Sequence, residues 1–237
     1  LENPNVVTSG AVVIDLTNSE DQVETWLDAP NDPDQTGFES VDASNYAKGA
    51  AQVTGDGNAN VIVGTANDDI LDGGAGADSI SGGSGGDALT GGDGDDTFDF
   101  DSQGDSEAAS NGLTSVDHIT DFDATANGEQ IDLSDVSITG AGSAAIADSG
   151  TAAVNTDTLE TDIDGIVSGD FGGTNGDVAV FAADGTGDLS SGDTFIAVDV
   201  DASGNFEVAN DMLIEVTGLT GTRGDVGLGG SDDIIMA

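Results

Sequence analysis

The chain has 237 residues and a mass of 23.3 kDa, which suits one large domain or two small ones. Its 47 acidic residues are opposed by only two basic ones, Lys48 and Arg223, so the formal net charge at pH 7 is −45. This charge excludes nucleic acid and anionic membranes as direct electrostatic partners. Cysteine is absent, which excludes disulfides and thiolate metal sites. With no apolar run of about 18 residues, we expect no membrane insertion.

Residues 1–54 are predicted to form a β-rich entry segment. It contains short apolar runs of the kind that form strands. These strands are expected at 12–16, 38–41 and 51–53. Between the first two, Ser19 and Gln22 could cap a short helix. The helix would carry Val23, Trp26 and Leu27.

Five uninterrupted nonapeptides fill residues 55–99, and such a fixed period indicates a stack of similar structural units. Their sequences are GDGNANVIV, GTANDDILD, GGAGADSIS, GGSGGDALT and GGDGDDTFD. The first position is glycine in all five. The eighth position is always apolar and holds Ile62, Leu71, Ile80, Leu89 and Phe98. The sixth position always offers a side-chain oxygen and holds Asn60, Asp69, Asp78, Asp87 and Asp96.

The chemistry of each position predicts its role. Glycines allow a tight turn in which backbone carbonyls can face inward, and the sixth residue adds a carboxylate to those carbonyls. The last three residues form a short strand whose middle side chain points into a narrow core. Because one nonapeptide makes half a coil, repeats on the same side are two apart. We therefore expect cations to be shared by the pairs Asn60/Asp78, Asp78/Asp96 and Asp69/Asp87.

The nonapeptides resemble the G-G-x-G-x-D-x-U-x repeat of the RTX (repeats-in-toxin) family. The resemblance implies an all-β fold, a parallel β-roll that binds several Ca²⁺ ions between its turns. One apolar side chain per repeat offsets little of the entropy lost when nine residues become ordered. We therefore predict that folding depends on calcium.

Residues 100–237 are predicted to form a further β-rich region. Its beginning, D-H-I-T-D-F at 117–122 followed by I-D-L-S at 131–134, resembles the stretch that closes the β-roll in serralysin-type proteases. By that resemblance Asp117 and Asp121 could cap the last calcium row, although a solvated strand face would show the same spacing. His118, the only histidine, is interpreted as structural.

The remaining sequence offers one more candidate metal site. Residues 141–187 are poor in bulky side chains and are predicted to be mostly loop. Three strands are expected at 178–181, 194–198 and 212–216. The turn between the last two begins like an EF-hand loop, with Asp199 and Asp201 as candidate ligands and Gly204 at the sixth position. Asn210 stands where such loops carry glutamate, so an ordinary hairpin turn is the alternative.

The last six residues, D-D-I-I-M-A, resemble the uncleaved C-terminal signal of type I secretion. Together with the repeats, this tail favours export by the type I secretion apparatus to the outside or the surface of a bacterial cell. Calcium sites of ordinary extracellular strength would fill there and stay empty in the cytosol.

Catalytic motifs are missing: the single histidine rules out H-E-x-x-H, and no G-x-S-x-G occurs. We therefore predict a non-enzymatic protein. The favoured function is a secreted structural protein that self-assembles through calcium into a filament, surface layer or matrix, because acidic copies can pack closely only if cations bridge them. The alternatives are a calcium-dependent folding and export module of a larger RTX hydrolase, or an adhesin fragment.

Overall fold

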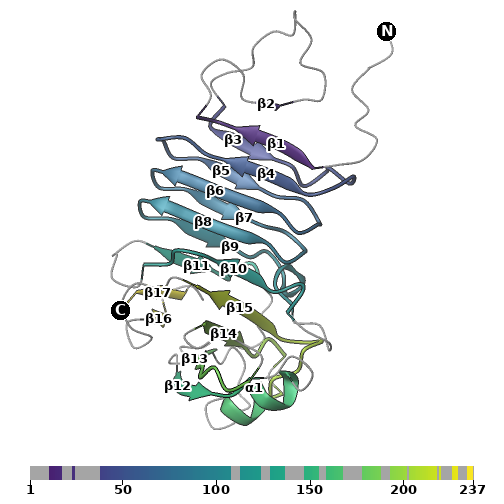
Figure 1. Cartoon of the computed structure of the whole chain (residues 1–237), viewed down its shortest axis with the longest axis vertical. Coiled ribbons are helices and arrows are strands. Elements are labelled where there is room, and N and C mark those ends of the chain that lie inside the picture. The colour runs from purple at the N-terminus through teal and green to yellow at the C-terminus, as the bar shows by residue number, and fades with distance from the viewer. Residues whose placement is uncertain are drawn as a thin grey trace, which may run out of the picture.

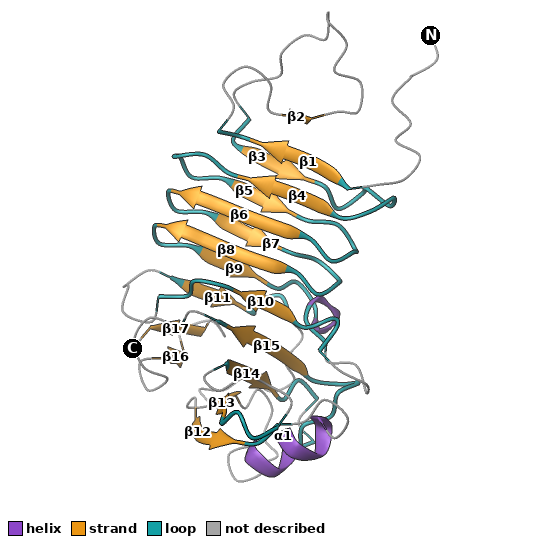
Figure 2. Cartoon of the chain, viewed as in Figure 1, coloured by secondary structure: helices purple, strands orange, loops and turns teal. Residues whose placement is uncertain are grey.

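The structure is a computed structural model. It describes residues 11–17, 23–24, 38–107, 113–123, 129–136, 147–154, 159–167, 178–187, 193–201, 203–217, 219, 226–228 and 234–236. Within these ranges the regular secondary structure is almost entirely β-strand and forms two sheets, which confirms the predicted fold class (Figures 1 and 2). No helix in the described ranges has the length and apolar character that crossing a bilayer requires.

Ten strands form the first sheet, in the order β12-β13-β14-β15-β10-β8-β6-β4-β1-β2. Their bounds are β1 Val12–Asp15, β2 Val23–Glu24, β4 Ala51–Thr54, β6 Ile70–Ala75, β8 Ala88–Asp93, β10 Asp117–Ile119, β12 Ala147–Ala152, β13 Val178–Ala183, β14 Thr194–Val198 and β15 Met212–Val216. The pairings from β1 through β4, β6, β8 and β10 to β15 are all parallel.

Seven strands form the second sheet, in the order β16-β17-β11-β9-β7-β5-β3. Their bounds are β3 Ser40–Asp42, β5 Val61–Val63, β7 Ser79–Ser81, β9 Thr97–Asp99, β11 Gln130–Asp132, β16 Val226–Leu228 and β17 Ile234–Met236. The chain alternates between the two sheets at every turn from β3 to β11, so each pair of strands is one coil of a parallel β-roll (Figure 1).

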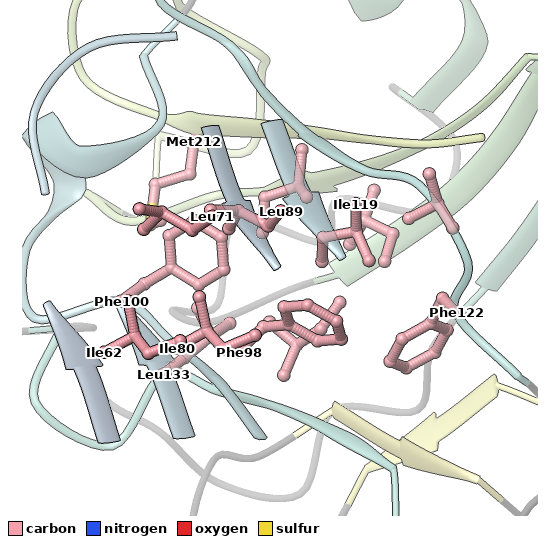
Figure 3. Packing of buried hydrophobic residues seen from close by; sticks show 14 of the residues in the cluster. Ile62, Leu71, Ile80, Leu89, Phe98, Phe100, Ile119, Phe122, Leu133 and Met212 are labelled. Atoms are coloured by element: carbon pink, nitrogen blue, oxygen red, sulfur yellow. The ribbon is translucent and has the colours of Figure 1, made fainter. Parts of the chain in front are cut away.

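The core of the roll is the predicted column of eighth-position side chains. Leu71 and Leu89 of the first sheet face Ile62, Ile80 and Phe98 of the second, and all five are fully buried (Figure 3). Parallel pairing without register shift places Ile62 beside Ile80 and Leu71 beside Leu89. In each strand the periodicity of two therefore puts the eighth-position side chain inward and its two neighbours outward.

Both sheets continue past the nonapeptides in each direction. β3 and β4 precede them, while β10 and β11 follow them in the same parallel stack. Ile119 of β10 and Ile131 of β11 extend the buried column. The predicted domain boundaries at 54/55 and 99/100 thus fall within continuous sheets, and they stay predictions.

A second apolar cluster lies beyond β15, where the first sheet is covered by the helix α1 (Leu159–Val167) (Figure 2). Ile163 and Val167 of α1 belong to this cluster, as do Phe181 of β13 and Phe195 of β14, whose rings stack at 5.4 Å between centroids. β13, β14 and β15 are buried along their whole length, and their sequences are mostly apolar, with Thr194 and Glu215 as the polar members.

Two sequence predictions about secondary structure need correction. The helix predicted around Val23 is wrong at that residue, because Val23 and Glu24 form strand β2 against β1; Ser19, Gln22, Trp26 and Leu27 lie outside the described residues. The segment 141–187, predicted as mostly loop before its strand, contains β12 and α1. Small residues in this segment hid the helix, although apolar residues at 159, 163, 166 and 167 fit its period.

Candidate metal sites

The sixth-position residues stack in two rows, one along each edge of the roll. In each row, the backbone N–H of one sixth residue donates to the carboxylate of the sixth residue two repeats later. Asn60 N donates to Asp78 Oδ1 at 2.7 Å, and Asp78 N donates to Asp96 Oδ1 at 2.9 Å. On the other edge, Asp69 N donates to Asp87 Oδ1 at 2.7 Å. The structure therefore brings together the three predicted pairs.

Buried carboxylate oxygens without a hydrogen-bond donor mark where a cation would fit. No donor within the described chain reaches Oδ2 of four buried aspartates, although their Oδ1 atoms are all hydrogen-bonded; these are Asp78, Asp87, Asp96 and Asp117. A buried ionised oxygen without a partner is costly, and native proteins pair such groups or use them as metal ligands.

The first two repeats differ from the last three in the hydrogen bonds that the side chain of the sixth residue accepts. Asp56 N donates to Asn60 Oδ1 at 2.9 Å, and Thr65 N donates to Asp69 Oδ2 at 2.5 Å. In the last three repeats the second residue is instead a glycine with positive φ: Gly74 at 97°, Gly83 at 85° and Gly92 at 101°. In the same three repeats, no donor among the described residues reaches Oδ2 of Asp78, Asp87 or Asp96. A positive-φ glycine at the second position thus accompanies an aspartate whose Oδ2 accepts no hydrogen bond.

First-position glycines leave room beside these oxygens. A Cβ at Gly73 would lie 2.6 Å from Asp78 Oδ2 and 2.7 Å from the carbonyl oxygen of Gly91, and the same pattern recurs at Gly55 and Gly64. Carboxylate and carbonyl oxygens therefore converge on a space that only glycine leaves open. Oxygen ligands of these two kinds suit a hard divalent cation, so the residues fit the ion that the sequence predicts.

Alanine at Gly73 is expected to weaken calcium binding, because its Cβ would fill the space between those two oxygens. We expect the calcium concentration at half-maximal β-structure to rise by roughly tenfold, which corresponds to ~1.4 kcal/mol. Circular dichroism during a calcium titration measures this. The matched control is Gly57→Ala in the same row of turns, where a Cβ would meet nothing within 4 Å. Equal midpoints for the two variants would contradict this role of Gly73.

Burial raises the pKa of the row carboxylates, and neighbouring acids raise it further. The pKa of Asp96 is raised to about 6, that of Asp87 to about 8 and that of Asp117 to about 9. Burial is the largest cause in each case, and Asp69 adds to the effect at Asp87. Without a cation, Asp87 and Asp117 therefore hold protons at neutral pH, whereas Asp96 does so only in mildly acidic solution. A divalent cation would replace the protons and keep the carboxylates ionised.

Asp117 and Asp121 lie at opposite ends of β10 and so belong to different rows, not to the single last row that was predicted. Asp117 follows Asp87, whose N–H donates to Asp117 Oδ1 at 2.8 Å. Asp121 lies on the opposite edge and accepts from Gly91 N at 3.0 Å and Gly92 N at 2.9 Å. The difference arises because each strand crosses from one row of turns to the other. Neither residue's role as a ligand follows from position alone.

The loop between β14 and β15 gathers three acids. Carboxylate oxygens of Asp199, Asp201 and Asp211 all lie within 4.8 Å of one another. The sequence identified the first two but missed Asp211, because the EF-hand pattern directed attention to Asn210, whose Nδ2 donates to Glu207 Oε2 at 2.6 Å. The pKa of Asp211 is raised to about 7 by burial first and then by Asp199 and Asp201. Strands flank this loop, as the sequence predicted.

His118, which the sequence analysis interpreted as structural, pairs with a carboxylate on the neighbouring strand. Its Nε2 lies 2.6 Å from Glu215 Oε2, directly across from β10 to β15. Hydrogen bonding to Glu215 raises the pKa of His118. Close by, the buried Ser106 hydroxyl donates to Leu213 O at 2.6 Å and accepts from Asp117 N at 2.9 Å. These contacts fasten the C-terminal strands to the end of the roll.

These features define a parallel β-roll with two rows of buried carboxylates in its turns. No protein-family model matches the chain, and no curated protein matches it either. Among solved structures, it is similar to the solution structure of the AlgE6R3 subunit from the Azotobacter vinelandii mannuronan C5-epimerase. The two are 23% identical over 79% of this chain and 78% of that one, with a TM-score of 0.43. At that level the likeness carries no weight for function, which has to be judged from the rows themselves.

Proposed function

We propose that this protein is a calcium-binding β-roll protein that functions outside the cell. The observation that carries the proposal is the set of buried Oδ2 atoms of Asp78, Asp87, Asp96 and Asp117, which no donor among the described residues reaches. An array of this kind is unfavourable as bare charge and favourable once divalent cations lie between the turns.

Calcium fits these rows better than the other common cations do. The ligands are oxygens from carboxylates and carbonyls, and the sequence contains no cysteine and only one histidine for softer metals. Magnesium needs near-ideal octahedral geometry and keeps several waters, whereas calcium accepts six to eight oxygens in irregular arrangements. Turns that share ligands between successive coils supply such an arrangement.

An extracellular location follows from the affinity expected of such sites. Calcium sites with Kd of about 10⁻⁴–10⁻³ M are empty in the cytosol and filled outside the cell. The chain would thus fold after export, and the type I route proposed from its C-terminal sequence delivers proteins in one step. The proposed role is structural, with no catalytic step assigned to any residue.

We further propose that copies assemble through calcium into a filament, layer or matrix. The net charge of −45 opposes close packing unless cations bridge the copies. Each sheet also carries a line of uncharged side chains on its outer face, and these lines favour contact between copies. They are Gln52, Ile70 and Ala88 on the first sheet, and Val61, Ser79 and Thr97 on the second. Ile70 is 56% exposed and Val61 is 48% exposed.

Assembly is tested by electron microscopy and sedimentation of the pure chain. In about 10 mM calcium, well above the expected Kd, we expect ordered polymers, and in excess chelator we expect them to dissociate. The same concentration of magnesium serves as the control for simple charge screening. A folded, calcium-loaded chain that stays monomeric at all protein concentrations would contradict assembly but leave calcium binding intact.

A further inference from the structure

The first coil of the roll, residues 55–72, closes both of its turns with its own hydrogen bonds. In the first nonapeptide, Asp56 N donates to Asn60 Oδ1 at 2.9 Å. In the second, Thr65 N donates to Asp69 Oδ2. The side chains of Asp56 and Thr65 also accept the N–H of the residue two positions further on, at 2.8 and 3.1 Å. The last three nonapeptides have glycine at this second position, which has no side chain to make such a bond.

Asp69 and Asp87 lie one coil apart in the same row and differ in the hydrogen bonds that they accept. Asp69 Oδ1 accepts from Ala51 N at 2.5 Å and from the Thr65 hydroxyl at 3.0 Å, while its Oδ2 accepts from Thr65 N. Asp87 Oδ1 accepts from Asp69 N, but no donor among the described residues reaches its Oδ2. Both side chains are only 1% exposed, so a difference in burial does not explain the contrast.

Asn60 brings neither a charge nor an unbonded side-chain oxygen to the start of the other row. Its Oδ1 accepts from Asp56 N, which fixes the orientation of the amide because an N–H group needs an acceptor. Its Nδ2 is buried and finds no acceptor among the described residues. The amide therefore directs a donor, the positive end of its dipole, into the interior of the row. A cation is repelled by such a group.

The bonded oxygens of the first coil are the ones that face the spaces left by its glycines. The side-chain oxygen nearest to a Cβ at Gly55 would be Asn60 Oδ1, and the one nearest to a Cβ at Gly64 would be Asp69 Oδ2. Both already accept an N–H group, and an N–H group competes with a cation for the same oxygen because both are positive. At Gly73, by contrast, the nearest side-chain oxygen accepts no hydrogen bond from the described residues.

We propose that the first coil binds no calcium and forms a calcium-independent start of the roll, so that cation binding begins with the third nonapeptide. The inference rests on the proposed calcium-binding function and departs from the repeat pattern, which predicts Asn60 and Asp69 as ligands. In a stack whose units contact only their neighbours, each coil has a stability of its own. Removal of calcium therefore loosens the last three nonapeptides first and the first coil last.

Native mass spectrometry of the full chain, titrated with calcium, compares Asp69→Asn with the matched variant Asp87→Asn. We expect Asp69→Asn to bind as many ions as wild type with the same midpoint, whereas Asp87→Asn binds one ion fewer. Asp69→Asn loses the bond from Thr65 N, so its melting temperature falls equally with and without calcium. One ion fewer in Asp69→Asn, or a loss of stability confined to the calcium-loaded protein, would overturn the inference.

Thr65→Gly tests the second turn by gain of a site and decides the matter if Asp69→Asn fails to fold. It gives this nonapeptide the second-position glycine of the last three and removes the hydroxyl bond to Asp69, so we expect one additional ion. A count equal to that of wild type contradicts the inference. A wild type that binds several ions, with one fewer in Asp69→Asn, contradicts the first-coil inference alone, whereas a wild type that binds none contradicts the calcium function as well.

Hydrogen exchange of the wild-type chain in excess chelator tests the order of loosening. We expect the backbone amides of β5 and the start of β6 to keep more protection than those of β7, β8 and β9. Equal loss of protection in all five strands would contradict a calcium-independent first coil.

Discussion

Replacing Asp87 with Asn is expected to lower the melting temperature of the calcium-loaded chain and to raise that of the metal-free chain. Asp87 is buried between Asp69 and Asp117, and its Oδ2 has no donor among the described residues. Asn can still accept the hydrogen bond from Asp69 N, but it brings no charge to a cation. In the metal-free chain, the same change removes a buried acid whose pKa is raised to about 8.

The loss of stability expected for Asp87→Asn in calcium can be estimated from the calcium affinity. A site with Kd near 10⁻⁴ M in about 10 mM calcium contributes about 2.7 kcal/mol. Its loss would lower the melting temperature by roughly 5–10 °C for a chain of this length. Thermal melts with and without calcium at pH 8.5 give both values. Asp95→Asn is the control, because Asp95 is exposed and its change should alter stability by less than about 0.5 kcal/mol.

The sign reversal distinguishes a cation site from a structural hydrogen bond. If Asp87 acted only through its bond to Asp69 N, the variant would have the same effect in calcium and in its absence. A variant that is destabilised equally in both conditions would therefore contradict the role of Asp87 as a calcium ligand.

The metal-free chain is expected to lose stability as pH rises, whereas calcium should stabilise it more at higher pH. The pKa values of Asp96, Asp87 and Asp117 are raised to about 6, 8 and 9, above the 3.8 of an unperturbed aspartate. Between pH 3.8 and its raised pKa, each of these aspartates holds its proton in the folded metal-free chain but not in the unfolded chain. The contribution of these groups to stability is therefore greatest below about pH 4, and it is lost as pH rises through their raised pKa values.

Calcium competes with those protons, so its stabilising effect grows over the same interval. The difference in melting temperature between calcium-loaded and metal-free protein should be small at pH 5 and large at pH 9. Metal must be removed by dialysis before the pH is changed, because chelators weaken in acid. A metal-free chain that becomes more stable from pH 5 to pH 9 would show that the row carboxylates are not buried as described.

Much of the roll could be predicted because its information is local and periodic. The apolar eighth position predicted the buried core from Ile62 to Phe98, and the spacing of the sixth position predicted which residues stack in pairs. Parallel pairing without register shift preserves a sequence period as a spatial one, so a residue 18 positions further along lies directly opposite. The resemblance to the RTX repeat predicted the same parallel β-roll.

The ends of the rows could not be predicted, because the period breaks there. The step from Asp87 to Asp117 is 30 residues rather than 18, and the sequence gives no register for it. For the same reason Asp121 was assigned to the same row as Asp117, although Asp121 accepts the N–H groups of Gly91 and Gly92 on the opposite edge.

The hydrogen bonds of the sixth-position side chains also differ between repeats, which the sequence pattern alone did not indicate. Asn60 and Asp69 occupy the predicted positions, yet their oxygens accept N–H groups from Asp56 and Thr65 in the same turn. The absence of a second-position glycine in these two repeats was visible in the sequence. Its consequence for the carboxylate needed the backbone angles, because it depends on where one N–H group points.

The most direct test of calcium as the source of stability is far-ultraviolet circular dichroism of the dialysed chain at pH 7.5 during a calcium titration. The account predicts weak β-structure with a low melting temperature at the start, a cooperative gain in both as calcium rises through about 10⁻⁴–10⁻³ M, and full reversal on adding chelator. A complete β-sheet spectrum with an unchanged melting temperature before any divalent ion is added would contradict it.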